Sequence, residues 1–465
     1  MKMVPNYIAT SLLIYASYSV GYDGGEVNRV PASLTKAHPE ITFRPCFFQN
    51  LPSKVSLEDL IERTLCNDPK VRTSWAAAQV QAAEVEIRKA AYLPRLDGSI
   101  GMLRNDIKVD YERGHNTHKS GHQQRQTNRL DLRWLLYDFG HRNAALRSAQ
   151  HLFTAATAEH DVQLQDSVVS AAQTYFQAAA AERHALISDE VARRAEENLK
   201  AVKARYVGGV ATLSDYLQAQ TTFSRSNTQR LRHAGASRTE TGVIAIRIGL
   251  PPDTQFSFDE SFQLPDFQFF SAVEELMQQA RLDHPTIVGA RANLAAAEAS
   301  AEQSRLAGWP KLSLTSSLSQ VSNDQSPVFD GDHKQRERSI GVQLSIPLFE
   351  GYERRSVVRK AKARVEAQIG SLQHAELQIG LAIWRNYQTF TTESKGFALT
   401  LELVNQARQS MTVAQGRYES GVGGITDLIH TLEIYALAQE QHIEGWKRWQ
   451  IARINLAANI GRLPY

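Results

Sequence analysis

The sequence predicts a mixed fold, in which an all-α-helical barrel continues into a transmembrane β-barrel that is shared between subunits and receives four strands from each chain. Three observations predict this fold. The 465-residue chain is internally duplicated, each half carries two strands in which apolar and polar residues alternate, and each half carries one helix far longer than those of ordinary globular domains. The prediction depends on the order of these signals along the chain rather than on any single motif.

The first signal along the chain is a short N-terminal apolar run. Residues 8–20 follow Lys2, which is typical of a secretory signal peptide, and a buried N-terminal helix is the alternative. Cys46 lacks the small and aliphatic residues that precede a lipid-modified cysteine, so we expect no lipid anchor. Cys46 and Cys66 could pair in an oxidising compartment, but two cysteines give no disulfide framework, and we expect free or weakly structural thiols.

Matching signals recur in the same order in both halves of the chain. Asp68-Pro69 returns as His284-Pro285 and Arg205-Tyr206 as Arg417-Tyr418, so the offset is 216 residues at first and 212 later. This period is too long for a solenoid and indicates a duplication at the gene level. The predicted organisation is a signal peptide at 1–22, a linker at 23–55, a first repeat at 56–250, a connector at 251–270 and a second repeat at 271–465.

Each repeat begins with an alanine-rich helix that ends before a proline, at about 56–91 and 271–307. Two strands of about ten residues follow, with apolar residues at every second position, as outer-membrane barrels require. The long polar segments 105–128 and 322–338 are expected to be loops; two half-buried hairpins on a soluble domain are the alternative. The residues expected on the membrane face are Leu130, Leu132, Trp134 and Leu136 in the first repeat and Ile340, Val342, Leu344 and Ile346 in the second.

A very long helix follows the strands of each repeat. Residues 141–207 contain no glycine and no proline, and a helix of this length extends about 100 Å; an ordinary coiled coil is the alternative. Its counterpart at 352–418 contains four glycines, so we expect the same helix with lower propensity. Both helices end in glycine-rich turns, and helices return to about residues 247 and 459. The turns contain Gly209 and Gly421, and the returning helices start with Ser214-Asp215 and Thr426-Asp427.

Four strands are too few to close a transmembrane barrel, for which about eight are the minimum. An open sheet edge in lipid would leave backbone groups without hydrogen bonds. Sharing the barrel removes these edges, and three copies would supply twelve strands in a ring with cyclic symmetry. The long helices would then continue the barrel as a tube, so the pattern predicts a duct made by several copies of the chain.

Composition and motifs argue against other functional classes. The net charge of +3 gives no basic footprint for nucleic acid, and the chain lacks an apolar stretch of about 18 residues that would span a bilayer as a helix. Nucleophile triads, phosphate-binding loops and paired catalytic carboxylates are not found in a convincing context, so we expect neither enzymatic activity nor a cofactor. His115, His118 and His122 could hold a metal ion, but an exposed polar loop is the favoured interpretation.

Together these features resemble the TolC family of outer-membrane channel-tunnels. The resemblance covers nearly all of the chain from residue 56. It is carried by the duplicated halves, by Tyr-x-x-Gly followed six residues later by Asp, and by the strand-to-helix junctions Leu136-Tyr137-Asp138-Phe139-Gly140 and Leu348-Phe349-Glu350-Gly351. It implies a homotrimer in the outer membrane of a Gram-negative cell, with a twelve-stranded barrel, a helical tunnel in the periplasm, and helical tips that dilate when an inner-membrane machine docks.

The resemblance assigns the helical turns to a periplasmic gate. By position, Asp215 and Asp427 match acidic tip residues of the family, and a ring of three Asp427 carboxylates would favour cations and resist closure; helix-start electrostatics is the alternative. Tyr418 matches a gating tyrosine, although Gly423 replaces an arginine of the family pattern and His430 replaces a second acidic residue. If His430 lines the pore, its charge could respond near pH 6; a structural histidine is the alternative. The residues assigned to the gate are Asp427, Asp215, Tyr418, His430, Ser214, Gly209 and Gly421.

The resulting functional prediction is a type I secretion channel that passes an unfolded protein, such as a toxin or an adhesin, to the exterior. The absence of a lipobox motif and the similarity of the Leu-Tyr-Asp-Phe-Gly stretch to members that serve protein secretion favour this cargo. The expected partners are an inner-membrane ABC exporter, a periplasmic adaptor of the membrane fusion type, and outer-membrane lipid. Drug or metal efflux is the alternative within the family. A periplasmic coiled-coil adaptor is the alternative from another class, and it would lack the four membrane strands.

Overall fold

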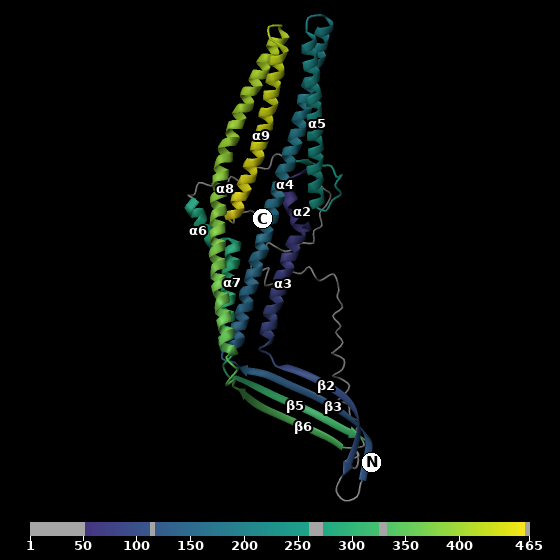
Figure 1. Ribbon diagram of the computed structural model, residues 1–465, viewed down its shortest axis with the longest axis vertical. Coiled ribbons are helices and arrows are strands. Elements are labelled where there is room, and N and C mark those ends of the chain that lie inside the picture. Colours follow the sequence, from purple (N-terminus) through teal and green to yellow (C-terminus); the bar gives the residue numbers. More distant parts are fainter. Residues whose placement is uncertain (1–51, 112–116, 260–272, 325–332, 461–465) are drawn as a thin grey trace.

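The computed structural model describes residues 52–111, 117–259, 273–324 and 333–460. They form one elongated molecule, with a four-stranded sheet at one end and two long helical hairpins that reach the other (Figure 1). The expected signal peptide and most of the linker lie outside the described residues. In chain order the elements are β1 (Lys54–Val55), α2 (Leu57–Asn67), α3 (Pro69–Ala90), β2 (Arg95–Tyr111), β3 (Thr117–Tyr137), α4 (His141–Val207), α5 (Leu213–Arg247), β4 (Ser257–Phe258), α6 (Val273–Asp283), α7 (Pro285–Leu306), β5 (Lys311–Asp324), β6 (His333–Ser345), α8 (Glu353–Glu419) and α9 (Ile425–Ile460).

Each repeat begins with two short helices rather than the one continuous helix expected from the sequence. Pro69 and Pro285 cause the break, because a proline disfavours helical geometry at the preceding residue and fits well at the first position of a new helix. The residues before the prolines are the N-caps of α3 and α7, Asp68 through its carboxylate and His284 through Nδ1. The expectation of a single helix in each repeat is therefore wrong.

The two long helices have equal length. α4 and α8 each span 67 residues, about 100 Å at the rise of an α-helix. The glycines of α8 leave it continuous, because α9 packs along it through a buried apolar cluster that includes Met411 and Tyr435, and such packing outweighs low local propensity. None of the helices in the described ranges combines the length and the apolar character needed to span a bilayer.

Midway along the molecule, small elements pack against the long helices. β1 pairs in parallel with β4, and Val55 and Phe258 from these strands join Phe176 of α4 and Ile454 of α9 in one buried apolar cluster. The beginning of the first repeat and the connector after it are thereby fixed to the last helix of the second repeat.

Cys66, at the end of α2, is disulfide-bonded. The expectation of free thiols is therefore wrong, because sequence positions alone do not reveal whether two cysteines approach to bonding distance. Cys46, the other cysteine of the chain, lies outside the described residues.

The four long strands form one antiparallel sheet rather than two separate hairpins. The strand order is β2-β3-β5-β6, so β3 of the first repeat pairs directly with β5 of the second. The strands also continue through most of 105–128 and 322–338, leaving only 112–116 and 325–332 between them, outside the described residues. The expectation of long loops is wrong, because backbone pairing continues beyond the part of the sheet that has one apolar face.

Several residues predicted for the strands and loops lie elsewhere. Ile346 lies one residue beyond the end of β6, and Leu136 lies at an irregularity in the pairing of β3 with β5. His118 and His122 belong to β3 rather than to a loop, whereas His115 lies outside the described residues. Within the described residues no group of histidine, cysteine or acidic side chains has a geometry suited to a metal ion.

Candidate channel wall and tip

The strand register places apolar residues of all four strands on one face of the sheet. Directly paired residues of antiparallel strands share a face. Leu96 pairs with Leu132, and Leu314 pairs with both Trp134 and Val342. An exposed apolar face of this extent is typical of a surface that contacts lipid. Its members are Leu96, Ile100, Met102, Leu130, Leu132, Trp134, Leu312, Leu314, Leu318, Ile340, Val342 and Leu344.

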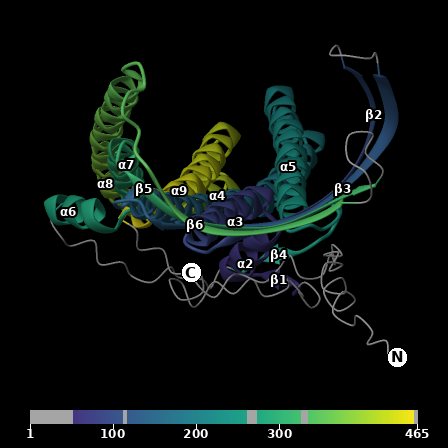
Figure 2. The ribbon, with the colours of Figure 1, turned by 90° about the horizontal axis from the view of Figure 1, so that it is seen from below.

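Charged and hydroxyl side chains occupy the opposite face. Arg95 Nε lies 3.1 Å from an oxygen of Asp97, and the hydroxyl oxygens of Ser317 and Ser339 are 2.9 Å apart. Figure 2 shows that the sheet is curved, as a segment of a barrel wall would be. A polar face on a curved membrane sheet suits a water-filled interior.

β2 and β6 are the two edges of this sheet, and neither pairs with a further strand among the described residues. Backbone groups at such an edge have no water to bind within a bilayer. The exposed side chains of Ile100 on β2 and Ile340 on β6 show that apolar residues extend to both edges, at 79% and 78% exposure. One chain therefore forms an incomplete wall that requires a partner at each side.

Aromatic side chains mark the boundary between the sheet and the helices. Trp134 donates from Nε1 to the carbonyl oxygen of Tyr92 at 2.9 Å. The ring of Phe139 lies 4.7 Å from that of Tyr137 and 5.3 Å from that of Trp309, between centroids. Amphipathic rings gather where a bilayer meets water, so this belt places the membrane surface at the strand-to-helix junctions. This belt was not predicted from the sequence, although aromatic residues close to the strand ends were a visible signal.

The two strand-to-helix junctions repeat one ion pair. Buried Asp138 lies 3.1 Å from Nε of Arg142, which follows four residues later, and Glu350 lies 2.5 Å from Nη2 of Arg354 at the same spacing. Positive φ angles follow each acidic residue and turn the chain from strand to helix. The junction motifs that carried the family resemblance thus have a structural role.

At the far end of the molecule, each long helix turns back at a glycine. Gly209 and Gly421 adopt left-handed φ angles of 71° and 76°. The amide of the next residue then donates to a carbonyl in the last turn of the long helix, at 2.8 Å after Gly209 and 2.9 Å after Gly421. Glycine is favoured here because other residues are strained in this conformation.

The two returning helices begin differently. Thr212, rather than Ser214, is the N-cap of α5, and it forms a capping box with Asp215: the hydroxyl donates to the carboxylate at 2.8 Å and accepts from the Asp215 amide at 3.1 Å. Gly424 takes the corresponding place before α9 and has no hydroxyl to offer. The Asp427 side chain is therefore exposed, and it has no hydrogen-bond or ion-pair partner among the described residues.

The remaining tip residues occupy different surroundings. Tyr418 is only 8% exposed, and Arg205 of the other hairpin lies 4.4 Å from its ring and donates to its carbonyl oxygen at 3.2 Å. His430 is exposed and lies farther along α9, where it lines a hollow of about 390 Å³ between α4, α5 and α9, together with His184 and Glu433. Tyr418 therefore joins the two hairpins of one subunit, and among the described residues of the two turns Asp427 is the acid whose carboxylate is unpaired.

Comparison with known proteins gives the family. The model of the family described as "Outer membrane efflux protein" matches residues 60–241 and 276–462. The chain belongs to the outer membrane efflux protein family. Protein CyaE of Bordetella pertussis is 28% identical over 98% of this chain and 95% of its own length. Outer membrane protein OprJ of Pseudomonas aeruginosa is 25% identical over 57% of this chain and 55% of its own length.

Solved structures of the family share this fold. A membrane protein from Pseudomonas aeruginosa has a TM-score of 0.75 at 21% identity, and the match covers 87% of this chain and 93% of that one. The outer membrane protein VceC from Vibrio cholerae has a TM-score of 0.70 at 20% identity, covering 87% and 96% of the two chains. The predicted fold class and the resemblance to TolC-type channels are confirmed.

Membership in the outer membrane efflux protein family places the protein in the outer membrane, extending into the periplasm. The protein is an export channel subunit, and the alternative of a periplasmic adaptor is excluded. The family consists of channels rather than enzymes. The two stretches matched by the family model correspond to the two repeats. The roles assigned to the tip residues stay predictions.

Proposed function

We propose that three copies of this chain form one channel-tunnel, through which a type I secretion machine passes an unfolded protein, such as a toxin or an adhesin, to the exterior. The observation that carries the proposal is a sheet with one continuous apolar face and two unpaired edges. Pairing β2 of one copy with β6 of the next yields twelve strands without an edge, enough for a barrel around water. The hairpins then extend the duct into the periplasm.

The nature of the cargo is supported by how far each similarity extends. Relatives whose names describe solvent or toluene efflux match 52–59% of this chain, and the pyoverdine export protein OpmQ matches 87%. Protein CyaE matches 98%. The junction sequence that begins at Leu136 also resembles members that serve protein secretion. Drug or metal efflux is the second candidate.

The helical tips are the proposed docking site for an inner-membrane ABC exporter and its periplasmic adaptor. Val207, Val210 and Val422 are exposed at the two turns. Exposed apolar residues at the end of an elongated molecule fit a partner-binding surface better than a solvated terminus. Inner-membrane partners approach from this side, because the sheet occupies the opposite end of the molecule (Figure 1).

Asp427 is the proposed selectivity residue of the tip. Its carboxylate is exposed and unpaired, whereas the Asp215 carboxylate is held by Thr212. Three copies of Asp427 around a narrow opening would attract cations and repel one another, which opposes complete closure.

Mass and conductance of the detergent-extracted protein test the channel. We expect a trimeric mass and cation-selective conductance in a planar bilayer. Asp427→Asn should reduce the preference for cations more than Asp215→Asn, the matched change at the equivalent position. A monomer that needs no detergent would refute the channel, and equal effects of the two substitutions would refute the selectivity role of Asp427.

Deleting the gene for the channel in its source bacterium tests the cargo. We expect one secreted protein to disappear from the medium and to accumulate inside the cell, while resistance to drugs, solvents and metals stays unchanged. Unchanged secretion together with increased sensitivity would instead establish efflux.

A further inference from the structure

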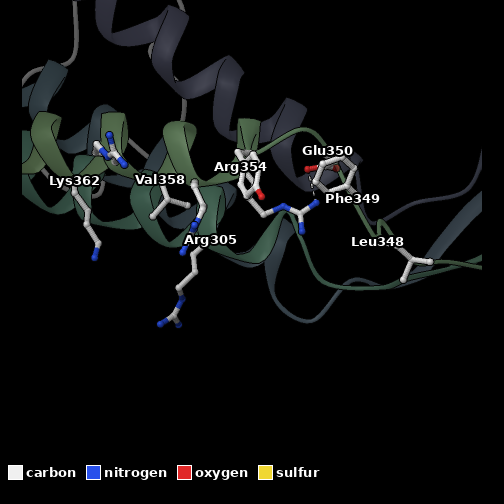
Figure 3. A pocket seen from close by; sticks show the side chains of 10 residues that line it. Arg305, Leu348, Phe349, Glu350, Arg354, Val358 and Lys362 are labelled. Atoms are coloured by element: carbon white, nitrogen blue, oxygen red, sulfur yellow. Dashed lines mark ion pairs between the residues drawn. The ribbon is translucent and has the colours of Figure 1, made fainter.

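A hollow of about 610 Å³ lies at the boundary between the sheet and the helices, where the end of α7 meets the start of α8 (Figure 3). Cationic side chains form much of its wall, and Leu348 and Phe349 form its side nearest the sheet. Figure 3 shows Arg305 of α7 and Lys362 of α8 extending to the same side of their helices. We refer to this hollow as the basic groove, and the residues that carry its argument are Arg305, Leu348, Phe349, Arg355, Arg359 and Lys362.

The cations of the basic groove are not neutralised by acids of the chain. Arg305, Arg355, Arg359 and Lys362 are exposed, and none forms an ion pair or hydrogen bond among the described residues. The acid of the groove, Glu350, is already paired with Arg354. Several unpaired cations around one hollow repel one another, so an anion that binds there relieves this repulsion.

The apolar wall of the groove lies directly beyond the end of β6. Leu348 is 91% exposed and Phe349 is 77% exposed, which is costly for side chains that face water. They follow β6, whose apolar residues Ile340, Val342 and Leu344 lie on the membrane face. The groove therefore combines a basic part on the helices with an apolar part beside the sheet.

The basic groove is formed by residues of a single chain. It lies between α7 and α8 of one subunit, on the side of α8 that faces α7. Arg355, Arg359 and Lys362 are four and three residues apart, so they share one face of α8. Lys360 and Arg364, also exposed, lie on a different face.

We propose that the basic groove binds the headgroup of an anionic phospholipid, such as phosphatidylglycerol, from the inner leaflet of the outer membrane. Arginine and lysine side chains bind the phosphate, while Leu348 and Phe349 contact the beginning of the acyl chains. No side chain caps the start of α8, so the positive end of its helix dipole also favours an anion beside the groove. The site fixes the depth of each subunit in the membrane, and it depends on the outer-membrane location, not on the cargo.

Lipid retention by matched double variants tests the proposal. We compare the detergent-extracted wild type with two double variants, Arg359→Gln/Lys362→Gln and Lys360→Gln/Arg364→Gln. The two variants remove the same charge from different faces of α8. Each is delipidated and titrated with phosphatidylglycerol or phosphatidylethanolamine, and bound lipid is counted by native mass spectrometry. We expect the wild type to prefer phosphatidylglycerol, and the groove variant to lose roughly tenfold in this affinity, with little change in the other variant.

Three outcomes would overturn the proposal. Equal losses in the two double variants would mean a general effect of surface charge. Equal retention of the two lipids would mean that the groove does not select an anion. Displacement of phosphatidylglycerol by an equal concentration of inorganic phosphate would mean that a free anion is the ligand. If the groove variant does not fold, as judged by helical circular dichroism and assembled mass, the milder Arg305→Gln tests the same prediction.

Discussion

His284→Asn should replace the acid-sensitive N-cap at the break between α6 and α7 with a cap that does not titrate. His284 is 6% exposed, and its Nδ1 accepts a hydrogen bond from the Thr286 amide at 3.2 Å. Burial lowers the pKa of this imidazole from its ordinary 6.5 to about 4. Protonation would also convert Nδ1 from an acceptor to a donor and so abolish the cap. Asparagine keeps an acceptor for the cap but does not titrate.

The sign and size of the effect follow from proton linkage. Because the pKa is lower in the folded state, the unfolded chain takes up the proton first, and acid favours unfolding. The contribution of His284 to the free energy of unfolding is complete above about pH 6.5 and is lost as the pH falls towards 4. The loss is about 2 kcal/mol at pH 5 and about 3 kcal/mol at pH 4. For a chain of this length, 2 kcal/mol lowers Tm by about 2 °C.

Thermal unfolding of the protein in detergent, followed by circular dichroism from pH 7.5 to 4, measures this loss. The wild type should lose more stability towards low pH than His284→Asn, and the two Tm curves should diverge below about pH 6.5. His374→Asn, at an exposed histidine of α8, controls for the general loss of a histidine and should follow the wild type. Parallel curves for the wild type and His284→Asn would refute the reasoning.

Three further changes test the wall and the tip. Ile340→Arg places a charge on the lipid face and should lower the free energy of unfolding by roughly 2–4 kcal/mol for a position near the bilayer centre. Unfolding by urea in lipid vesicles measures this change, and an unchanged midpoint would contradict a lipid-facing position. Arg205→Met removes a link between the hairpins and should increase single-channel conductance, whereas Arg417→Met, at the exposed equivalent position, should not; equal conductances would contradict the link. Gly424→Thr should form a capping box with Asp427, stabilising α9 by about 1 kcal/mol and weakening cation selectivity, and unchanged selectivity would show that this carboxylate does not act at the opening.

The signals that succeeded in the sequence are local and periodic. The first long helix was predicted at its observed bounds, because 141–207 lacks glycine and proline and is followed at once by a glycine turn. The alternating strand residues were placed on one face, because that pattern depends only on the pleat of a single strand. Family membership required the order of such signals across both repeats.

The features that were missed depend on distant contacts or on competition between nearby signals. Pairing of β3 with β5 joins strands from different repeats, and no residue in either strand specifies the other. At the start of α5, Ser214 and Thr212 both have a hydroxyl suited to capping, and only the structure shows that Thr212 fits Asp215. The link from Arg205 to Tyr418 was missed because it joins two hairpins that are distant in the sequence. Tyr418 was expected only as a residue of the pore.

Direct pairing of β3 with β5 has a consequence for how the channel is built. Each chain makes three strand pairings within its own sheet, so only one further hydrogen-bonded seam per subunit is needed to close a shared barrel. Assembly would then depend on concentration at a single type of contact, between β6 of one copy and β2 of the next. A peptide that copies either edge strand could occupy that contact and stop construction at an open intermediate, before any duct exists.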